Sequence, residues 1–199
     1  PVWISEELSH EETNSETGKT TTVDDTIASR LFYDDGHLYF GTGKNSGSGK
    51  YYVIDTKSEK KEDATKTEEI KNVKEIISSE GSFYLKNAVK VGQYIITSDN
   101  QGTISSIDTK NNDKVVSTKE IGKRFSGGIA YDKTTNMIYF VAGTNDLYGV
   151  KVGNDGTFGE EKSVRVYETG YSAMTPEVYN GKVYVSGCVG TSPFSDKGY

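Results

Sequence analysis

A short pattern recurs four times along the chain, and it limits the possible folds more than any other feature. Each copy has a turn, an apolar run and a second turn, and its run carries a tyrosine at Tyr39, Tyr94, Tyr139 or Tyr184. These tyrosines are 55, 45 and 45 residues apart. A repeat of this length predicts a row of similar units, each burying its apolar faces against its neighbours.

Each unit can be divided into four strands separated by polar or glycine-containing turns. In the clearest unit the expected strands span residues 83–89, 93–98, 103–108 and 115–120, and in the next unit 128–131, 137–142, 146–152 and 162–167. The second strand is apolar on both faces, whereas apolar and polar residues would alternate in a strand of a sheet with one solvent-exposed face. Blades packed around an axis bury both faces of their inner strands. We therefore predict an all-β β-propeller of four-stranded antiparallel blades.

The repeat frame also sets the expected domain boundaries. Blades are predicted at residues 27–80, 81–123, 124–170 and 171–199, and the last of them is truncated. Residues 1–26 carry no repeat, so we expect the last strand of a preceding blade at residues 2–5 and a polar loop at 11–25. About three and a half blades make an incomplete ring, and its open edges predict self-association.

One stretch fits two interpretations. Ile70, Val73, Ile76 and Ile77 have helical spacing within a charged segment. The repeat frame instead favours a strand and an inserted loop there, which also suits the longer first spacing.

The repeat sequence resembles the PQQ-like (pyrroloquinoline-quinone-like) propeller repeat, and more narrowly that of secreted or cell-surface propeller proteins of Gram-positive gut bacteria. Residues 99–102, 126–132 and 175–185 carry this likeness, together with the strand end at 54–57. The resemblance implies a propeller over residues 27–199. It does not imply a quinone, because no tryptophan follows the repeats and Cys188 is the only cysteine, so the vicinal cysteine pair of quinone sites is impossible. We expect no cofactor.

Motifs that suggest chemistry fail on their spacing. The glycine-rich run 41–50 is not a phosphate-binding loop, because Tyr51 follows Lys50, so we expect a loop between two strands of a hairpin. The acidic turn at 154–156 would place Lys151 at the first position of a calcium-binding loop, where an aspartate is needed. His10, His37 and Cys188 are too few and too scattered for zinc. We therefore expect no catalytic, cofactor-binding or metal-binding residues.

Several polar and aromatic residues keep two interpretations. Asp55 and Asp108 each close a strand and are expected to accept hydrogen bonds in the following turn. Asp34, Asp35 and Asp99 fit turns, although these three could share a loop calcium site. The pairs Glu68-Glu69 and Glu160-Glu161 are expected on solvent-exposed faces. Tyr171, Tyr179 and Tyr199 could stack on sugars or pack between blades. Cys188 is expected as a small buried side chain in a strand.

Charge and composition narrow the functional classes. The net charge of −6 opposes phosphate binding, so no nucleic-acid partner is expected, and no apolar run reaches membrane-spanning length. We predict a non-enzymatic extracellular or cell-surface binding and scaffold domain of bacterial origin. Its end loops would contact an unknown protein or carbohydrate ligand. The alternative is the propeller part of an enzyme, either quinoprotein-type or glycan-active.

Overall fold

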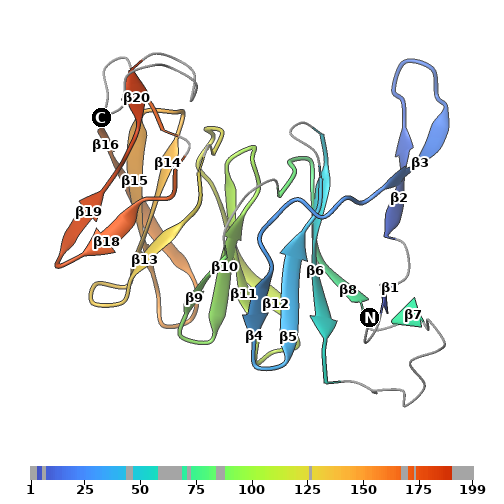
Figure 1. Cartoon of the computed structure of the whole chain (residues 1–199), viewed down its shortest axis with the longest axis horizontal. Helices are drawn as coiled ribbons and strands as arrows, with labels where there is room; N and C mark the ends of the chain where they lie inside the picture. Colours follow the sequence, from blue (N-terminus) through green and yellow to red (C-terminus); the bar gives the residue numbers. More distant parts are fainter. Residues whose placement is uncertain are drawn as a thin grey trace.

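The computed structural model describes residues 4–5, 8–43, 47–57, 69–70, 73–83, 88–125, 127–166, 170–172 and 174–189. Every regular element within these ranges is a β-strand, and none is a helix able to cross a membrane. Three four-stranded antiparallel sheets stand side by side along the long axis of the molecule (Figure 1). The chain is thus an incomplete β-propeller, as the repeat predicts.

Each sheet is one blade, with its strands in chain order from the inner to the outer edge. Blade 1 contains β4 (Phe32–Asp34), β5 (His37–Gly41), β6 (Gly49–Asp55) and β8 (Val73–Ser79). Blade 2 contains β9 (Val89–Val91), β10 (Tyr94–Ser98), β11 (Thr103–Asp108) and β12 (Lys114–Glu120). Blade 3 contains β13 (Ala130–Asp132), β14 (Met137–Ala142), β15 (Asp146–Val152) and β16 (Phe158–Arg165).

A fourth unit is only begun in the described residues. The hairpin β18 (Glu177–Tyr179) and β19 (Lys182–Tyr184) repeats the first two strands of a blade, and β17 (Gly170–Tyr171) pairs with β20 (Cys188–Val189). This hairpin accounts for the predicted half blade.

The ambiguous segment around Ile76 is strand β8 and not a helix. Its pairing with β6 slips by one residue, so that Tyr51 faces Ile77 while Tyr52 faces Glu75. Such a β-bulge brings two neighbouring residues onto one face of a strand. The resulting 3-and-4 spacing of apolar residues therefore imitates a helical pattern.

The strand pairing corrects the frame of the repeat. The second strand of each unit begins at an equivalent residue: His37, Tyr94, Met137 and Lys182. The residue equivalent to Tyr39 is therefore Ile96. Tyr94 is wrongly placed in the predicted tyrosine series. Because side chains alternate along a strand, this error of two residues leaves every side chain on its expected face. Hence the blades were still recognisable from the sequence.

The amino-terminal segment also differs from its prediction. The expected polar loop at 11–25 contains the antiparallel pair β2 (Ser9–Thr13) and β3 (Thr20–Asp24). Threonine-rich runs favour extended backbone, and the Asn14 carboxamide folds the turn by accepting the N–H groups of Glu16 (3.0 Å) and Thr17 (2.9 Å). The other expected element is also different: β1 (Ile4–Ser5) pairs in parallel with β7 (Glu69–Ile70), while residues 2–3 lie outside the described ranges.

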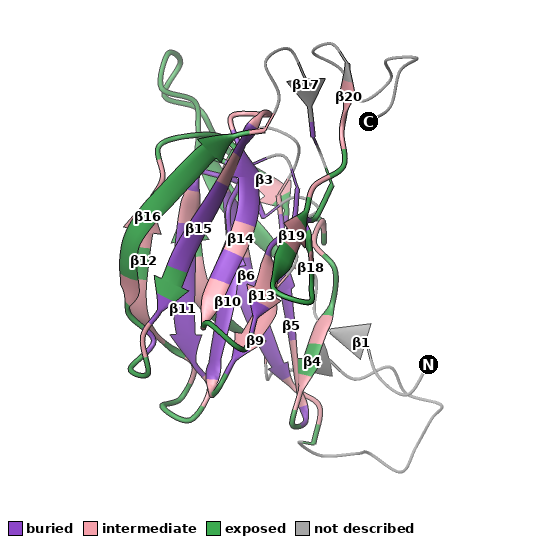
Figure 2. Cartoon of the chain, turned by 90° about the vertical axis from the view of Figure 1, so that its left-hand side faces the viewer, coloured by how far each residue is buried: buried purple, intermediate pink, exposed green. Residues whose placement is uncertain are grey.

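Both faces of the central strands are buried, as expected for radially packed blades. Ile95 and Ile96 are adjacent on β10 and both have 0% exposure, Ile95 packing toward blade 1 and Ile96 toward blade 3. Figure 2 shows buried strands in the middle of the stack and an exposed outer strand β16. Two separate apolar clusters therefore join the three blades.

A second contact between blades involves aromatic side chains and the outer turn of the next blade. Tyr39 of blade 1 donates its hydroxyl to Asp113 Oδ1 in the β11–β12 turn of blade 2 (2.7 Å). Tyr94 of blade 2 lies directly against Gly156 in the β15–β16 turn of blade 3, where a Cβ atom would come within 2.6 Å of the tyrosine ring. Gly156 also has a φ of +79°, which favours glycine. Each of these two outer turns thus packs against the preceding blade.

We expect Gly156→Ala to destabilise the protein by about 2–4 kcal/mol, because left-handed backbone strain of about 1 kcal/mol adds to overpacking against Tyr94. Gly92→Ala is the matched control, since Gly92 also has a positive φ but nothing lies within 4 Å of its Cβ position. That control should lose only about 1 kcal/mol. Urea unfolding of the three proteins measures the difference, and equal losses for the two variants would contradict the seating of this turn on Tyr94.

Candidate functional site

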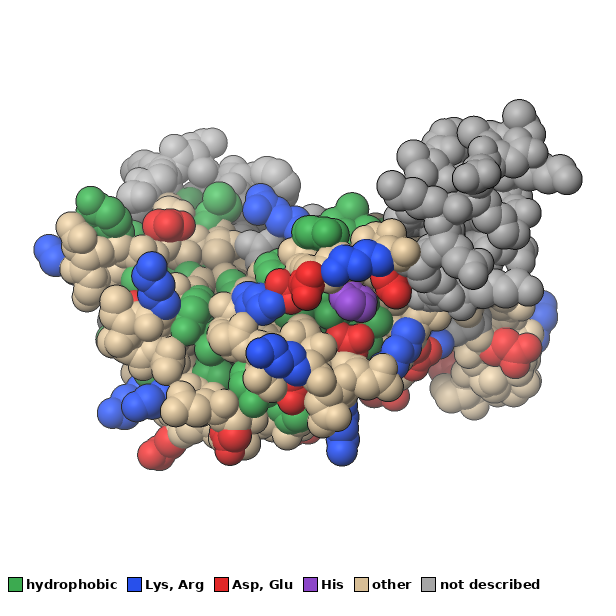
Figure 3. All heavy atoms as spheres, turned by 90° about the horizontal axis from the view of Figure 1, so that it is seen from below, with side chains coloured by type: hydrophobic (Ala, Val, Ile, Leu, Met, Phe, Trp, Pro, Cys, Tyr) green, Lys and Arg blue, Asp and Glu red, His purple; other side chains and the backbone are tan. Residues whose placement is uncertain are grey.

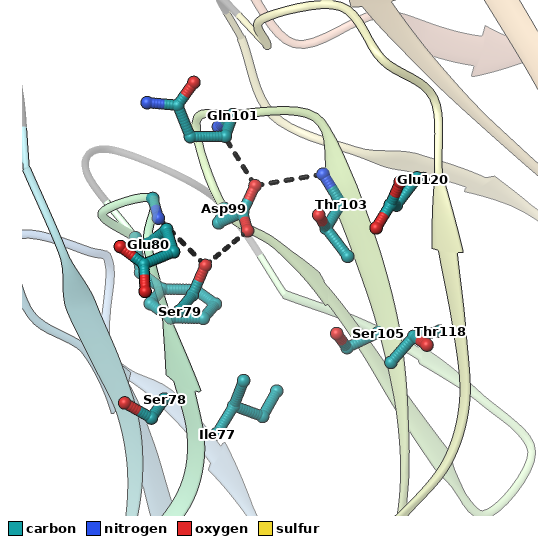
Figure 4. Close-up of a pocket in the computed structure, with 12 residues that line it drawn as sticks. Ile77, Ser78, Ser79, Glu80, Asp99, Gln101, Thr103, Ser105, Thr118 and Glu120 are labelled. Carbon is teal, nitrogen blue, oxygen red and sulfur yellow. Dashed lines mark hydrogen bonds between the residues drawn. The ribbon is translucent and has the colours of Figure 1, made fainter.

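A groove opens between blades 1 and 2, at the end of the blades that carries the β10–β11 hairpin (Figure 4). It encloses a cavity of about 360 Å³ between β8 on one side and β11 and β12 on the other. Most of the residues that line it carry polar side chains, and Ile77 and Phe83 add apolar surface. The lining residues are Ile77, Ser78, Ser79, Glu80, Gly81, Phe83, Asp99, Gln101, Thr103, Ser105, Thr118 and Glu120.

Beside the groove, blade 2 lacks an aromatic pair that its neighbours possess. In blade 1 Phe40 stacks on its cross-strand partner Tyr52 (ring centroids 5.5 Å apart), and in blade 3 Phe140 stacks on Tyr148 (5.7 Å). Phe40 and Phe140 lie three residues after the start of their strands, and the equivalent residue of β10 is Thr97. Its cross-strand partner is Ser105. Small hydroxyl side chains therefore replace two large rings on the face that blade 2 turns toward blade 1.

The mouth of the groove differs from the next junction in the same way. Between blades 2 and 3, Asp146 accepts hydrogen bonds from Lys123 Nζ (2.7 Å) and Arg165 Nε (3.1 Å). Lys123 Nζ also lies 5.7 Å from the centre of the Tyr148 ring. These three charged side chains cover the mouth of that junction.

The corresponding residues at the groove can be assigned from backbone contacts. In the strand register, Asp146 lies opposite Arg165 and Thr103 lies opposite Glu120, so Thr103 corresponds to Asp146 and Glu120 to Arg165. Lys123 corresponds to Gly81, because the residue after each of them makes the same backbone hydrogen bond to the next hairpin. The Arg124 carbonyl accepts the N–H of Gly143, and the Ser82 carbonyl accepts the N–H of Asn100. Glycine, threonine and glutamate thus replace lysine, aspartate and arginine, and none of the described residues that line this mouth is basic.

Asp99 holds the two walls of the groove together. Its Oδ1 accepts the N–H groups of Gln101 (3.0 Å), Gly102 (2.9 Å) and Thr103 (2.9 Å), which shapes the β10–β11 turn. Its Oδ2 accepts the hydroxyl of Ser79 from blade 1 (2.6 Å; Figure 4). Both carboxyl oxygens of Asp99 are therefore used by the fold, and the predicted turn role of this residue is confirmed.

Two other carboxyl groups flank the groove from opposite walls. Glu80 follows β8 in blade 1 and Glu120 ends β12 in blade 2, and both are exposed (Figure 4). Among the described residues that line the cavity, none is Lys, Arg or His. The local field therefore favours ligands that donate hydrogen bonds or carry positive charge, and it opposes anions.

The acidic groups that could have shared a calcium ion do not meet. Asp34 and Asp35 lie at the β4–β5 turn, at the opposite end of the blades from Asp99. Asp34 pairs with Lys90, and Asp35 pairs with Lys57 (3.0 Å), whose hydrogen bond lowers the pKa of that carboxyl. Within the described ranges, no three His, Cys, Asp or Glu side chains gather as a metal site would require.

His37 stands in the same charged turn region. Figure 3 shows this end of the molecule, where basic and acidic side chains lie close together. The His37 ring tilts toward Tyr39, at 6.4 Å between centroids. His10 lies in β2, and its side chain is outside the described set.

The remaining predicted polar residues mostly take turn roles. Asp55 and Asp108 each accept the N–H two residues later, from Lys57 (2.8 Å) and Lys110 (3.0 Å). In the 154–156 turn, Asp155 accepts both the N–H and the hydroxyl of Thr157 (3.1 and 2.7 Å). These contacts confirm the predicted strand-ending turns.

Other predictions have mixed outcomes. The 41–50 run does join two hairpin strands, β5 and β6, although residues 44–46 lie outside the described part. Glu160 and Glu161 are exposed on β16, and Glu161 pairs with Lys119 (2.5 Å). Cys188 lies in β20 but is half-buried, whereas full burial was expected. Tyr179 is 65% exposed, whereas Glu68, Tyr199 and the side chains of Glu69 and Tyr171 lie outside the described set.

Sequence reasoning did not find the groove. The signal was present as two polar residues, Thr97 and Ser105, at positions where the neighbouring units have aromatic rings. The shifted tyrosine frame obscured this comparison, because it aligned Phe40 and Phe140 with Ile95 and not with Thr97.

Comparison with known proteins supports the fold. No family model matches the sequence, and a search of curated proteins gives no match. Among solved structures, the chain is similar to BamB from Moraxella catarrhalis, with a TM-score of 0.55 and 19% identity over 84% of this chain and 46% of that one. It is also similar to the computationally designed Ika8 protein (TM-score 0.55, 10% identity, 81% and 42% covered).

The N-terminal domain of Nup159 is a third such structure, with a TM-score of 0.51 and 7% identity over 84% of this chain and 41% of that one. The chain spans less than half the length of each of these three structures. At such low identities the likeness shows the propeller fold alone.

The closed junction between blades 2 and 3 predicts an acid-sensitive contribution to stability. Lys123, followed by Arg165, holds the pKa of Asp146 below its ordinary value. A lowered pKa in the folded state means that this stabilisation is complete above about pH 4 and is lost as the pH falls through the folded-state pKa.

We therefore expect Asp146→Asn to lower the Tm at pH 7, with a difference from wild type that shrinks below about pH 4. Thermal unfolding monitored by circular dichroism between pH 2.5 and 7 measures this. Glu160→Gln, an exposed change on β16, is the control and should follow the wild type. An Asp146→Asn difference that stays constant across this pH range would show that the ion pairs do not stabilise the junction.

Proposed function

We propose that this chain is a non-enzymatic binding and scaffold domain, and that the groove between blades 1 and 2 holds its ligand. The observation that carries the proposal is the replacement of the aromatic pair by Thr97 and Ser105. A cavity of about 360 Å³ falls within the usual range of small-ligand sites. A ligand bound in this open groove would contact Ser105, at a position where the neighbouring blades carry an aromatic ring.

The chemistry of the lining supports a carbohydrate or a protein segment as the ligand. Both offer the hydroxyl, amide or ammonium donors that hydroxyl and carboxyl acceptors bind. The acidic mouth and the net charge of −6 oppose a phosphate-rich partner. Binding at this groove would replace the channel-end loops as the expected contact surface.

We also propose an extracellular or cell-surface location on a bacterium. This rests on the repeat's likeness to secreted propeller proteins of Gram-positive gut bacteria and on a composition with a single cysteine.

Ser105→Tyr tests the groove by restoring one ring of the missing pair. Ser105 is 4% exposed and lines the cavity, so the new side chain should fill it. On glycan and peptide arrays, we expect the full-length wild type to bind ligands that the variant binds at least tenfold more weakly. Ser163→Tyr, at an exposed position of β16, should bind as the wild type does. No array ligand at all, or equal binding by both variants, would refute the proposal.

We further propose that the unfinished fourth unit associates with a second copy of the chain. Four large apolar side chains are at least half exposed on and beside this unit: Val164 (58%), Met174 (60%), Tyr179 (65%) and Tyr184 (50%).

Light scattering after size exclusion should show the full-length protein as a dimer at about 100 μM, a concentration at which a micromolar interface is filled. Tyr184→Lys should shift it toward monomer without changing its Tm, because Tyr184 is half exposed. A wild type that stays monomeric over this concentration range would eliminate this mode of assembly.

A further inference from the structure

We infer that the groove binds an amino sugar, that is, a saccharide unit carrying a protonated amine. This inference rests on the proposed binding function and specifies the ligand of the same site. Its basis is the comparison between two junctions of one molecule, one filled by the protein's own side chains and one left open.

At the closed junction, between blades 2 and 3, the protein's own side chains fill the space that corresponds to the groove. Between blades 2 and 3 the space holds two aromatic rings, with the Lys123 ammonium beside the Tyr148 ring and bonded to Asp146. The filling is thus a flat apolar body with a cation at its outer end. An occupant of similar shape and charge would suit the open junction.

The open junction has no lysine of its own at the equivalent position. That position is Gly81, where a Cβ atom would come within 2.7 Å of the Gln101 side chain and 3.1 Å of Asn100 Oδ1. A longer side chain at this position would therefore require the Gln101 side chain to move. The place of the Lys123 ammonium remains available to a cation from outside the chain.

Uncompensated carboxyl groups stand near that place. Glu80 and Glu120 flank it from opposite walls, and neither forms an ion pair in the described part of the protein. Asp99, the third carboxyl group in the lining, already accepts four hydrogen bonds from protein donors. An ammonium group bound at this mouth, beside either glutamate, would supply the positive charge that Lys123 and Arg165 provide at the other junction.

The rest of the lining selects a sugar over a plain amine. Ser78, Ser79, Thr103, Ser105 and Thr118 carry hydroxyl groups that both donate and accept, so they match a ring bearing several hydroxyls. Ile77 and Phe83 add apolar surface to the lining, and the Phe83 ring packs against Tyr51 (ring centroids 5.3 Å apart). A pyranose ring offers the same combination of an apolar face and a polar rim.

Calorimetric titration of the full-length protein distinguishes the possible ligands. The probes are a β-1,4-linked glucosamine tetramer, its fully N-acetylated counterpart and tetralysine. We expect the glucosamine tetramer to bind at least tenfold more tightly than either of the others. Its affinity should fall as salt is raised, since the carboxyl groups are exposed.

A double variant isolates the charge. Glu80→Gln combined with Glu120→Gln should weaken the glucosamine tetramer at least tenfold and leave binding of the N-acetylated tetramer unchanged. Because both residues are exposed, the Tm should not change. Glu160→Gln, an exposed glutamate on β16 away from the groove, is the matched control and should bind as the wild type does.

The outcomes separate this inference from the function on which it rests. If the N-acetylated tetramer or tetralysine binds as tightly as the glucosamine tetramer, the amino-sugar assignment is wrong. If some other array ligand binds and is lost in Ser105→Tyr while the glucosamine tetramer does not bind, the groove is a binding site for another class of ligand. If no ligand is lost in Ser105→Tyr, both the site and its assigned ligand fail.

Discussion

Packing between the faces of neighbouring blades is the constraint on which the rest of this structure depends. A four-stranded sheet this small cannot bury both of its apolar faces alone, so each blade needs a neighbour on either side. Ile95 and Ile96 show this directly, because adjacent residues of one strand are completely buried in two different clusters. The outer turns add a second layer of contact, since Tyr39 and Tyr94 each support the turn of the following blade.

The groove is a local exception to this packing and not a feature added to the fold. The backbone pairing of blade 2 follows that of blade 3, yet its side chains at a few facing positions are small or acidic. A repeat protein can therefore acquire a site by changing side chains at one junction while the backbone frame stays intact. For the same reason the ligand is proposed by comparison with the neighbouring junction, where Phe140, Tyr148 and Lys123 lie at the equivalent positions.

The fold was largely predictable from the sequence, whereas the site was not. Period, turns and two-faced apolar strands specify blades even when the frame is wrong by two residues, because such an error preserves the face of every side chain. The bulge in β8 and the β2–β3 hairpin depend on pairing partners that local patterns do not reveal. The groove required an exact alignment of Thr97 with Phe40 and Phe140, and only the hydrogen-bonded register supplies it.

The hydrogen bond between Ser79 and Asp99 has a consequence for motion. It joins the outer strand of one blade to a hairpin of the next, close to the mouth of the groove. The two walls belong to separate sheets, so the width of the groove is set by the angle between those sheets. Any partner or neighbouring segment that rotates blade 1 against blade 2 would widen or narrow the groove, and a ligand bound across it would resist that rotation.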